Sequence, residues 1–155
     1  MYEFLDNLIK LKCELIIFTS SAKQKSEEII NKIEKNKKYF NNRLYREHCT
    51  LMGAAYVKDI LKLGRDLSKT IIIDNACDNF QLQSDNGIFI NTWIDDKKDT
   101  TLYDLIPMLK EIVIKKVKDV RKALRKVRDT MMRLYVKGDN TPYNTVVQFI
   151  KKNQK

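Results

Sequence analysis

Two short apolar runs, each ending in polar residues, constrain the fold of this chain most. The first run covers residues 14–18 and is followed by Thr19. The second contains three consecutive isoleucines and is followed directly by Asp74 and Asn75. Short, bounded runs of this kind predict buried strands of a parallel sheet. In open α/β sheets, ligands bind beyond the carboxyl ends of the strands. The polar residues therefore occupy a position where a site is expected.

The segments around these runs have the spacing of helices. Residues 1–12 and 25–38 place their apolar side chains on one face, which predicts amphipathic helices. Residues 102–112 have the same pattern, and Pro107 is expected to kink that helix or delay its start. Residues 87–90 predict a third, edge-like strand. This alternation of strands and helices predicts an α/β fold with a parallel sheet.

The positive charge lies in the carboxyl-terminal region. Residues 1–109 contain sixteen Lys/Arg and sixteen Asp/Glu, whereas residues 110–155 contain fourteen and four, and so carry the whole net charge of +10. Apolar residues in this region alternate by four and three positions: Val113, Val117, Val120, Leu124, Val127, Met131 and Leu134. This heptad predicts one basic amphipathic helix that stops near Gly138. We therefore divide the chain into a body, residues 1–112, and a basic helical tail, residues 113–155.

Three interpretations of the tail are open. It packs its apolar seam onto the body, it pairs with a second copy to form a homo-oligomer, or it binds an anionic partner such as a nucleic acid or a membrane surface. The absence of interleaved aromatics and of a groove-reading motif argues against specific nucleic-acid readout. No apolar run reaches the ~18 residues of a membrane span. Three widely spaced cysteines fit no disulfide or zinc pattern, which favours a reducing, intracellular compartment.

Five short motifs in a fixed order point to a family. They are FTSS at 18–21, LYREHC at 44–49, YVKD at 56–59, LGRDL at 63–67 and IIDN at 72–75. Together they resemble the NLI-interacting-factor-like phosphatases of the haloacid dehalogenase superfamily, which act on the carboxy-terminal domain of RNA polymerase II. The resemblance runs from about Tyr2 to Ile112. It implies a three-layer, Rossmann-like parallel sheet and dephosphorylation of a protein or peptide at Ser/Thr, in the nucleus or cytoplasm.

The resemblance also implies site residues. Thr19 resembles the hydroxyl residue that binds phosphoryl oxygens, and Lys58 resembles the lysine that neutralises them. Arg46 resembles an arginine on the substrate side. Asp74 and Asn75 resemble the loop that holds Mg²⁺, with Asn75 as direct ligand and Asp74 as its support. Such groups suit phosphoryl transfer, because cations and hydroxyl donors stabilise the charge on the transferred group, and Mg²⁺ prefers oxygen ligands.

The family's nucleophile has no counterpart here. It is the first Asp of an Asp-x-Asp motif on a central strand, upstream of the helix that residues 1–12 resemble, and the chain contains no Asp-x-Asp. We therefore expect an N-terminally truncated or catalytically deficient domain, inactive as written, with weak or absent Mg²⁺ binding. The missing strand belongs between the strands that end at Thr19 and Asp74. Three explanations remain open: the chain is a fragment, the two strands pair directly, or another chain donates a strand.

A second resemblance gives an alternative function. The motifs at 18–21, 46–49 and 65–69 are also similar to the presequence receptor of the mitochondrial inner-membrane translocase. This resemblance implies a non-catalytic, phosphatase-like binding module at the mitochondrial inner membrane.

Overall fold

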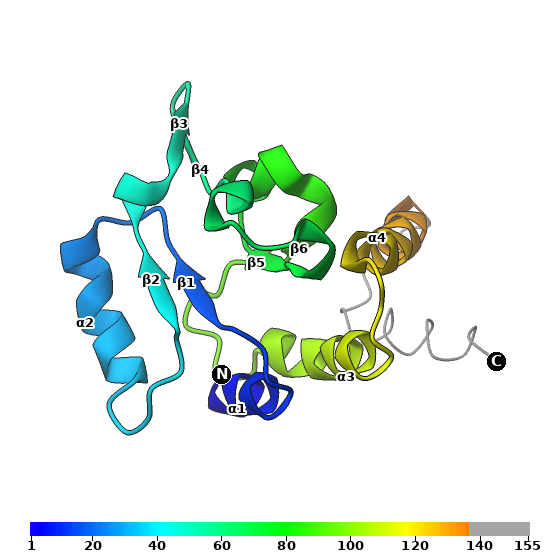
Figure 1. Ribbon diagram of the computed structural model, residues 1–155, viewed down its shortest axis with the longest axis horizontal. Helices are drawn as coiled ribbons and strands as arrows, with labels where there is room; N and C mark the ends of the chain where they lie inside the picture. The colour runs from blue at the N-terminus through cyan, green and yellow to red at the C-terminus, as the bar shows by residue number, and fades with distance from the viewer. Residues whose placement is uncertain (137–155) are drawn as a thin grey trace.

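The computed structural model describes the backbone of residues 1–136 and the side chains of residues 1–129. Short strands alternate with helices along the chain (Figure 1). The α-helices are α1 (Tyr2–Lys10), α2 (Lys23–Ile33), α3 (Thr101–Ile114) and α4 (Val120–Val136). The strands are β1 (Ile16–Phe18), β2 (Asn42–Leu44), β3 (Thr50–Met52), β4 (Ala55–Val57), β5 (Ile72–Asp74) and β6 (Gly87–Phe89). Among these helices, none combines the length and apolar character needed to cross a membrane.

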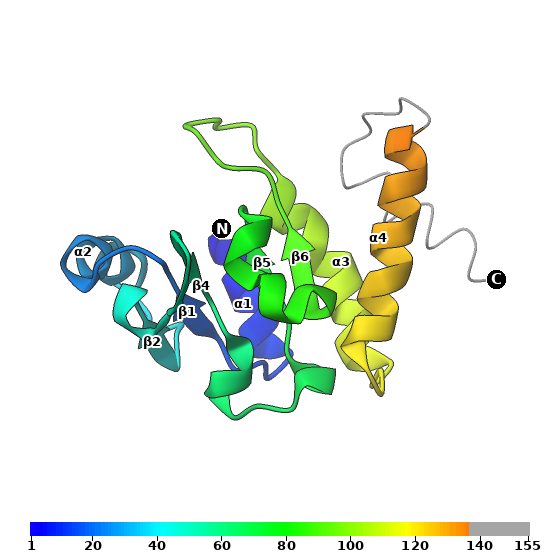
Figure 2. The same cartoon turned by 90° about the horizontal axis from the view of Figure 1, so that it is seen from above.

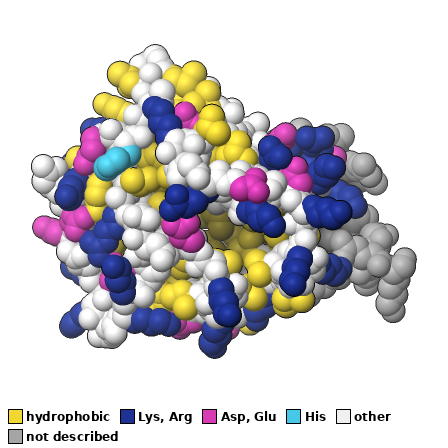
Figure 3. Space-filling view, viewed as in Figure 1, with side chains coloured by type: hydrophobic (Ala, Val, Ile, Leu, Met, Phe, Trp, Pro, Cys, Tyr) yellow, Lys and Arg dark blue, Asp and Glu magenta, His cyan; other side chains and the backbone are white. Residues whose placement is uncertain are grey.

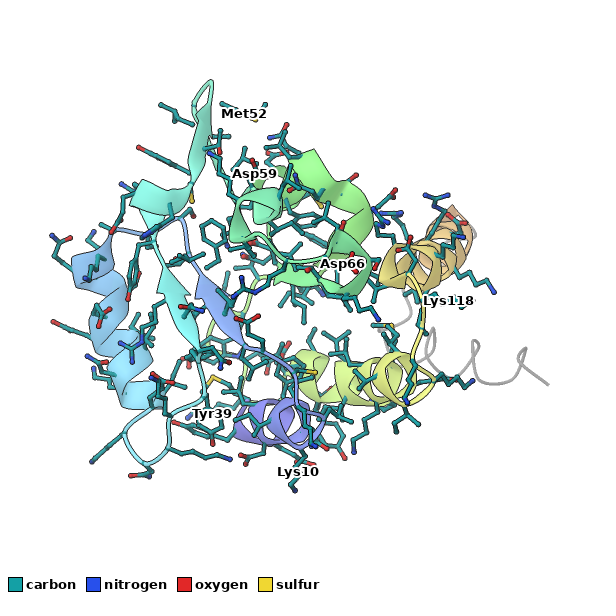
Figure 4. The ribbon with its side chains drawn as sticks, viewed as in Figure 1. Lys10, Tyr39, Met52, Asp59, Asp66 and Lys118 are labelled. Carbon is teal, nitrogen blue, oxygen red and sulfur yellow. The ribbon has the colours of Figure 1, made fainter. Side chains whose placement is uncertain are left out.

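The strands form three separate pairs. β1 pairs with β2 and β5 pairs with β6, both in parallel, while β3 and β4 form an antiparallel hairpin. The hairpin projects from the body, with Met52 near its tip (Figure 4). This mixture of helices and short parallel pairs agrees with the expected α/β class. Direct pairing of β1 with β5, one of the three explanations for a missing strand, is not formed.

Helices α3 and α4 supply much of the apolar core. Leu105 and Leu109 of α3 are buried together with Phe4 and Leu5 of α1, and Figure 2 shows α4 on the far side of α3 from the β1–β2 pair. Val120, Leu124 and Val127 of α4 join the same core, with exposed fractions of 4%, 3% and 6%. These three positions of the heptad seam are therefore buried in the core of the same chain, so they are not available to a coiled-coil partner.

The tail is not one continuous helix. α3 extends to Ile114 and ends in a turn in which Lys116 has a φ of 48°. The amide of Lys116 donates to the carbonyl of Val113 at 3.0 Å, and the amide of Val117 donates to that of Ile112 at 3.1 Å. These bonds are those of a Schellman motif, which ends a helix. The prediction of a single helix from Val113 onward is therefore wrong. Met131, Leu134 and the predicted stop at Gly138 lie outside the residues whose side chains are described.

Two other helix boundaries differ from the sequence prediction. α3 begins at Thr101 and continues through Pro107, so the delayed start is wrong. α2 ends at Ile33 rather than Lys38. The cause is Glu34, whose carboxylate accepts the backbone amides of Tyr39 at 2.6 Å and Phe40 at 2.7 Å. These bonds stabilise a loop where the helix was expected to continue.

Candidate phosphoryl-binding site

Lys58 and Asp74 form a buried ion pair at the ends of two strands. Lys58 directly follows β4 and Asp74 ends β5, and their exposed fractions are 8% and 5%. The second carboxylate oxygen of Asp74 accepts the amide of Ala76 at 2.9 Å and the side-chain amide of Asn79 at 3.0 Å. A buried charge is tolerated only when it is paired and hydrogen-bonded. Both oxygens of Asp74 meet that condition.

The ammonium of Lys58 keeps unused donors. An ammonium carries three N–H donors, and Asp74 is its only hydrogen-bond acceptor within the described residues. Its backbone is held separately, because its amide donates to the carbonyl of Asn79 at 2.6 Å. Lys58 is thus fixed in position and can still donate to an incoming anion.

Thr19 and Arg46 lie together at the end of β1. The hydroxyl oxygen of Thr19 accepts the amide of Ser21 at 3.1 Å, so its hydrogen remains available to a ligand. The guanidinium of Arg46 donates through Nε to the carbonyl of Ser20 at 2.8 Å. Helix α2 begins after Ala22 without a side-chain cap, so Thr19 does not cap that helix.

Tyr56 and Cys49 both contact Arg46. The guanidinium of Arg46 stacks on the ring of Tyr56, 4.9 Å from its centroid, and Tyr56 lies two residues before Lys58. Cys49 is half-buried, and burial raises the pKa of its thiol. Lys58 and Arg46 act on that pKa in the opposite direction, while Asp74 adds to the increase. Cys49 therefore lies within the electrostatic reach of both cations and of Asp74.

A shallow pocket lies beside these residues. Its volume is about 520 Å³, and its lining includes Lys23, Arg46, Glu47, Cys49 and Tyr56. The sequence analysis assigned no role to Cys49 and did not single out Tyr56 or Asn79. The only signal for Asn79 was a second Asp-Asn pair shortly after Asp74-Asn75.

The described residues do not by themselves fit a magnesium ion. Asn75 is exposed and its amide nitrogen donates to Thr92 at 2.8 Å, which leaves its oxygen as a ligand. Both oxygens of Asp74 are committed to Lys58, Ala76 and Asn79. Among residues 1–129, no group of three or more His, Cys, Asp or Glu side chains is placed to hold a metal. Mg²⁺ requires near-octahedral oxygen coordination, so further ligands are needed.

Comparison with known proteins shows the family of this chain. Residues 1–121 match the family described as NLI interacting factor-like phosphatase. The chain is 44% identical over 112 residues to CTD small phosphatase-like protein 3 of Caenorhabditis elegans, which covers 72% of this chain and 39% of that protein. It is 38% identical over 96 residues to CTD nuclear envelope phosphatase 1B of Danio rerio, covering 62% of this chain and 39% of the relative.

A relative from protein import also matches. Mitochondrial import inner membrane translocase subunit TIM50 of Kluyveromyces lactis is 35% identical over 116 residues, which cover 75% of this chain and 24% of that subunit. In each of these alignments the matched region is less than half of the relative. Because the family match covers most of the chain, the chain belongs to the NLI interacting factor-like phosphatase family, within the haloacid dehalogenase superfamily.

Proposed function

We propose that this chain is the phosphoryl-binding part of a protein serine/threonine phosphatase and that it does not catalyse phosphoryl transfer alone. The observation that carries the proposal is the buried Lys58, whose ammonium retains donors beside Asp74. Arg46 and the hydroxyl of Thr19 lie at the neighbouring strand end. Cations and hydroxyl donors of this kind stabilise the charge on a phosphoryl group.

The same proposal includes inactivity of the chain alone. Asp74 is the buried carboxylate of the site, and its oxygens are engaged by Lys58, Ala76 and Asn79, so it is a poor nucleophile. In the complete enzyme, an additional strand with two aspartates would supply the nucleophile and the missing Mg²⁺ ligands. Asn75 would contribute one oxygen to that ion, and a phosphoprotein or phosphopeptide would be the substrate.

Two measurements on the purified 155-residue protein test the proposal. With p-nitrophenyl phosphate and Mg²⁺ we expect no turnover above background. In a titration with inorganic phosphate or orthovanadate we expect millimolar binding that Lys58→Ala abolishes. Lys62→Ala is the matched control, because Lys62 is exposed and donates to Thr50 at 2.7 Å, away from Asp74. Turnover that depends on Lys58 would contradict inactivity, and equal binding by both variants would contradict the phosphoryl site.

The alternative is a non-catalytic module of the translocase type, favoured by the 35% identity over 116 residues to a TIM50 subunit. It predicts binding of a basic amphipathic peptide that resembles a presequence. Fluorescence anisotropy with a labelled peptide, at physiological salt, distinguishes the two functions. If the anisotropy stays unchanged up to millimolar protein, this alternative is wrong. That result would not bear on the proposed phosphoryl site.

A further inference from the structure

The turn between α3 and α4 carries an exposed apolar side chain among lysines. Ile114, the last residue of α3, is 68% exposed, although Ile112 two positions earlier is buried in the core. Residues 110–122 contain six Lys/Arg and two Asp/Glu. Figure 3 shows dark blue side chains along the part of the molecule that carries α3 and α4. Single exposed apolar side chains are ordinary, so the charges around Ile114 decide whether it marks a binding surface.

Ion pairs in this region engage only part of its positive charge. Lys115 pairs with Glu111, and Arg121 donates to Asp119 at 2.8 Å. Three further lysines are exposed and form no ion pair among residues 1–129: Lys116, Lys118 and Lys122. Their charges are therefore not balanced by acidic side chains of the described structure.

Helix dipoles explain only some of these lysines. A cation near the carboxyl end of a helix is stabilised by the helix dipole, which accounts for Lys115 at the end of α3. The same effect disfavours cations at the amino end of a helix, and Lys118 and Lys122 lie on either side of Val120, where α4 begins. The first turn of α4 contains no acidic residue. The dipole of α4 therefore opposes the charges that this turn carries.

Lysines also close α1 and α3 at a backbone position that favours glycine. Lys116 has a φ of 48° at the end of α3, and Lys12 has a φ of 59° at the end of α1. The amide of Lys12 donates to the carbonyl of Ile9 at 2.8 Å, which is the counterpart of the bond from Lys116 to Val113. Glycine adopts this conformation without strain, whereas a side chain makes it costly. Both helix ends therefore carry a lysine where folding alone favours glycine.

α1 and α3 present these ends on the same side of the molecule. The two helices pack against each other in the core, and Figure 2 shows both running from the upper part of the view toward its lower edge. Figure 4 places Lys10 on α1 and Lys118 at the connection between α3 and α4. Lys10 and Lys12 are exposed. The end of α1 therefore adds its lysines to those of the α3–α4 turn.

We propose that this side of the molecule, which we call the lysine face, binds the surface of a membrane that contains anionic lipids. The lysine face consists of Ile114 and the lysines around it: Lys10, Lys12, Lys115, Lys116, Lys118 and Lys122. Each lysine close to an anionic bilayer strengthens binding by about fivefold. Ile114 enters the boundary between the headgroups and the acyl chains.

Ile114 favours a membrane over other polyanions. A nucleic acid or an acidic polypeptide would attract the lysines but would bring charged groups against the exposed isoleucine. A bilayer interface accommodates both, because apolar side chains enter it while lysine ammonium groups extend to the headgroups. Bidentate recognition of phosphates favours arginine, whereas every cation of the lysine face is a lysine. One apolar side chain and a basic cluster together suit reversible attachment.

The inference goes beyond the proposed function and does not rest on it. Phosphoryl binding depends on Lys58 and Arg46, which lie beside the ends of β4 and β1. Neither residue belongs to the lysine face. The two proposals can therefore fail separately.

Co-sedimentation of the 155-residue protein with lipid vesicles tests the role of the lysines. We expect binding to phosphatidylcholine vesicles that contain about 30% phosphatidylserine, and none to phosphatidylcholine alone or at high salt. Lys118→Gln with Lys122→Gln is expected to weaken binding about twentyfold. Lys25→Gln with Lys32→Gln is the matched control, because both lysines are exposed on α2 and Figure 1 shows α2 at the opposite end of the molecule. This control removes the same net charge and is expected to change binding less than about twofold.

Replacement of Ile114 separates a membrane from a soluble polyanion. Ile114→Gln is expected to weaken vesicle binding about threefold or more, because less apolar surface enters the bilayer. Binding to duplex DNA, measured in parallel, is expected to be the same for this variant and the parent. Ile29→Gln is the control for vesicle binding, since Ile29 is 61% exposed on α2. It is expected to bind vesicles as the parent does.

Lys116→Gly separates the charge of this residue from its structural role. Glycine suits a φ of 48°, so the variant is expected to unfold at a higher temperature than the parent. Its binding to phosphatidylserine vesicles is expected to be about fivefold weaker. Stabilisation with unchanged vesicle binding would show that the charge of Lys116 is not used at a membrane.

Other results would also overturn the proposal. Absence of binding to phosphatidylserine vesicles would exclude a membrane surface as the partner. Equal losses from the α2 pair and from Lys118→Gln with Lys122→Gln would mean that net charge alone drives binding. Unchanged vesicle binding by Ile114→Gln would leave only a soluble polyanion, such as a nucleic acid or an acidic polypeptide, as a specific partner. Failure of phosphate binding in the separate titration leaves all these outcomes unchanged.

Discussion

Lys58 and Asp74, sixteen residues apart in the sequence, form a buried ion pair that connects the strand β4 to the strand β5. Solvent screens neither charge well, because the exposed fractions of Lys58 and Asp74 are 8% and 5%. Removing one partner leaves the other as an uncompensated buried charge, which costs far more than the net contribution of the pair. The effect on stability of replacing one residue is therefore expected to depend on whether the other is present.

This coupling gives the first prediction. Lys58→Met is expected to lower the free energy of unfolding by about 3–5 kcal/mol, because it leaves the buried carboxylate of Asp74 without a counter-charge. The double variant Lys58→Met with Asp74→Asn is expected to lose less than the sum of the two single losses, since the neutral amide needs no counter-charge. Urea unfolding followed by circular dichroism measures the cycle. Strict additivity would show that the pair is not coupled.

The second prediction concerns pH. Burial acts to raise the pKa of Glu34, but hydrogen bonds from the amide of Phe40 and from Arg43 outweigh it and hold that pKa below the ordinary value of a glutamate. A lowered folded-state pKa means that the stabilisation is complete above the unfolded-state pKa and is lost as the pH falls through the folded-state value. Glu34→Gln is therefore expected to cost about 1–3 kcal/mol at pH 7.

The cost of this variant should shrink in acid. Below the folded-state pKa, Glu34 in the parent protein is protonated and resembles glutamine in charge. Unfolding of both proteins at several pH values checks this, with Glu28→Gln as the control because Glu28 is exposed. A cost that stays constant between neutral and acidic pH would contradict the assignment.

The third prediction concerns the docking of α4. The carboxylate of Asp85 accepts Arg128 at 2.7 Å and Arg125 at 3.1 Å, which lowers the pKa of Asp85. These groups are 40–58% exposed, so the pair contributes only about 0.5–1 kcal/mol. Asp85→Asn is expected to increase hydrogen exchange in α4 a few-fold, whereas Asp78→Asn, at an exposed position in the same segment, is not. Salt should reduce the difference between the two variants.

The fourth prediction concerns Gly87, the first residue of β6. A Cβ at this position would lie 2.0 Å from Cε2 and 2.4 Å from Cδ2 of Phe80, which is buried. Gly87→Ala is expected to destabilise the protein by about 1–3 kcal/mol through overpacking. Adding Phe80→Leu should recover part of that loss by relieving the clash.

Gly53, in the β3–β4 hairpin, provides a contrast. No atom lies within 4 Å of a Cβ built there, but its φ is +60°. Gly53→Ala is therefore expected to cost about 1–2 kcal/mol from backbone strain alone, and Phe80→Leu should not change this value. Recovery by Phe80→Leu in both backgrounds would contradict the steric explanation for Gly87.

Local sequence patterns predicted three of the strands correctly, β1, β5 and β6. The apolar runs before Thr19 and Asp74 are strands β1 and β5, because β-branched residues bounded by polar ones favour short buried strands. The family resemblance implied that Lys58 and Asp74 belong to one site, and the structure brings the two side chains into contact. The functional roles of Thr19, Arg46, Lys58, Asp74 and Asn75 remain predictions.

Other features depend on tertiary contacts that no local pattern encodes. The heptad from Val113 gave no sign of the turn at Lys116, because a non-glycine residue with positive φ leaves no sequence signal. α2 ends early because the carboxylate of Glu34 accepts hydrogen bonds from amides farther along the chain. Asn79 was missed for the same reason, since its contact with Asp74 arises only when the loop folds back.

The packing of α4 has a practical consequence for anyone who shortens this protein. The family match stops at residue 121, whereas α4 begins at Val120 and buries Leu124 and Val127 farther on. A recombinant version that ends at residue 121 would expose the apolar surface of the core that α4 covers, and it is expected to aggregate. Expression boundaries for this protein therefore belong beyond α4, which ends at Val136.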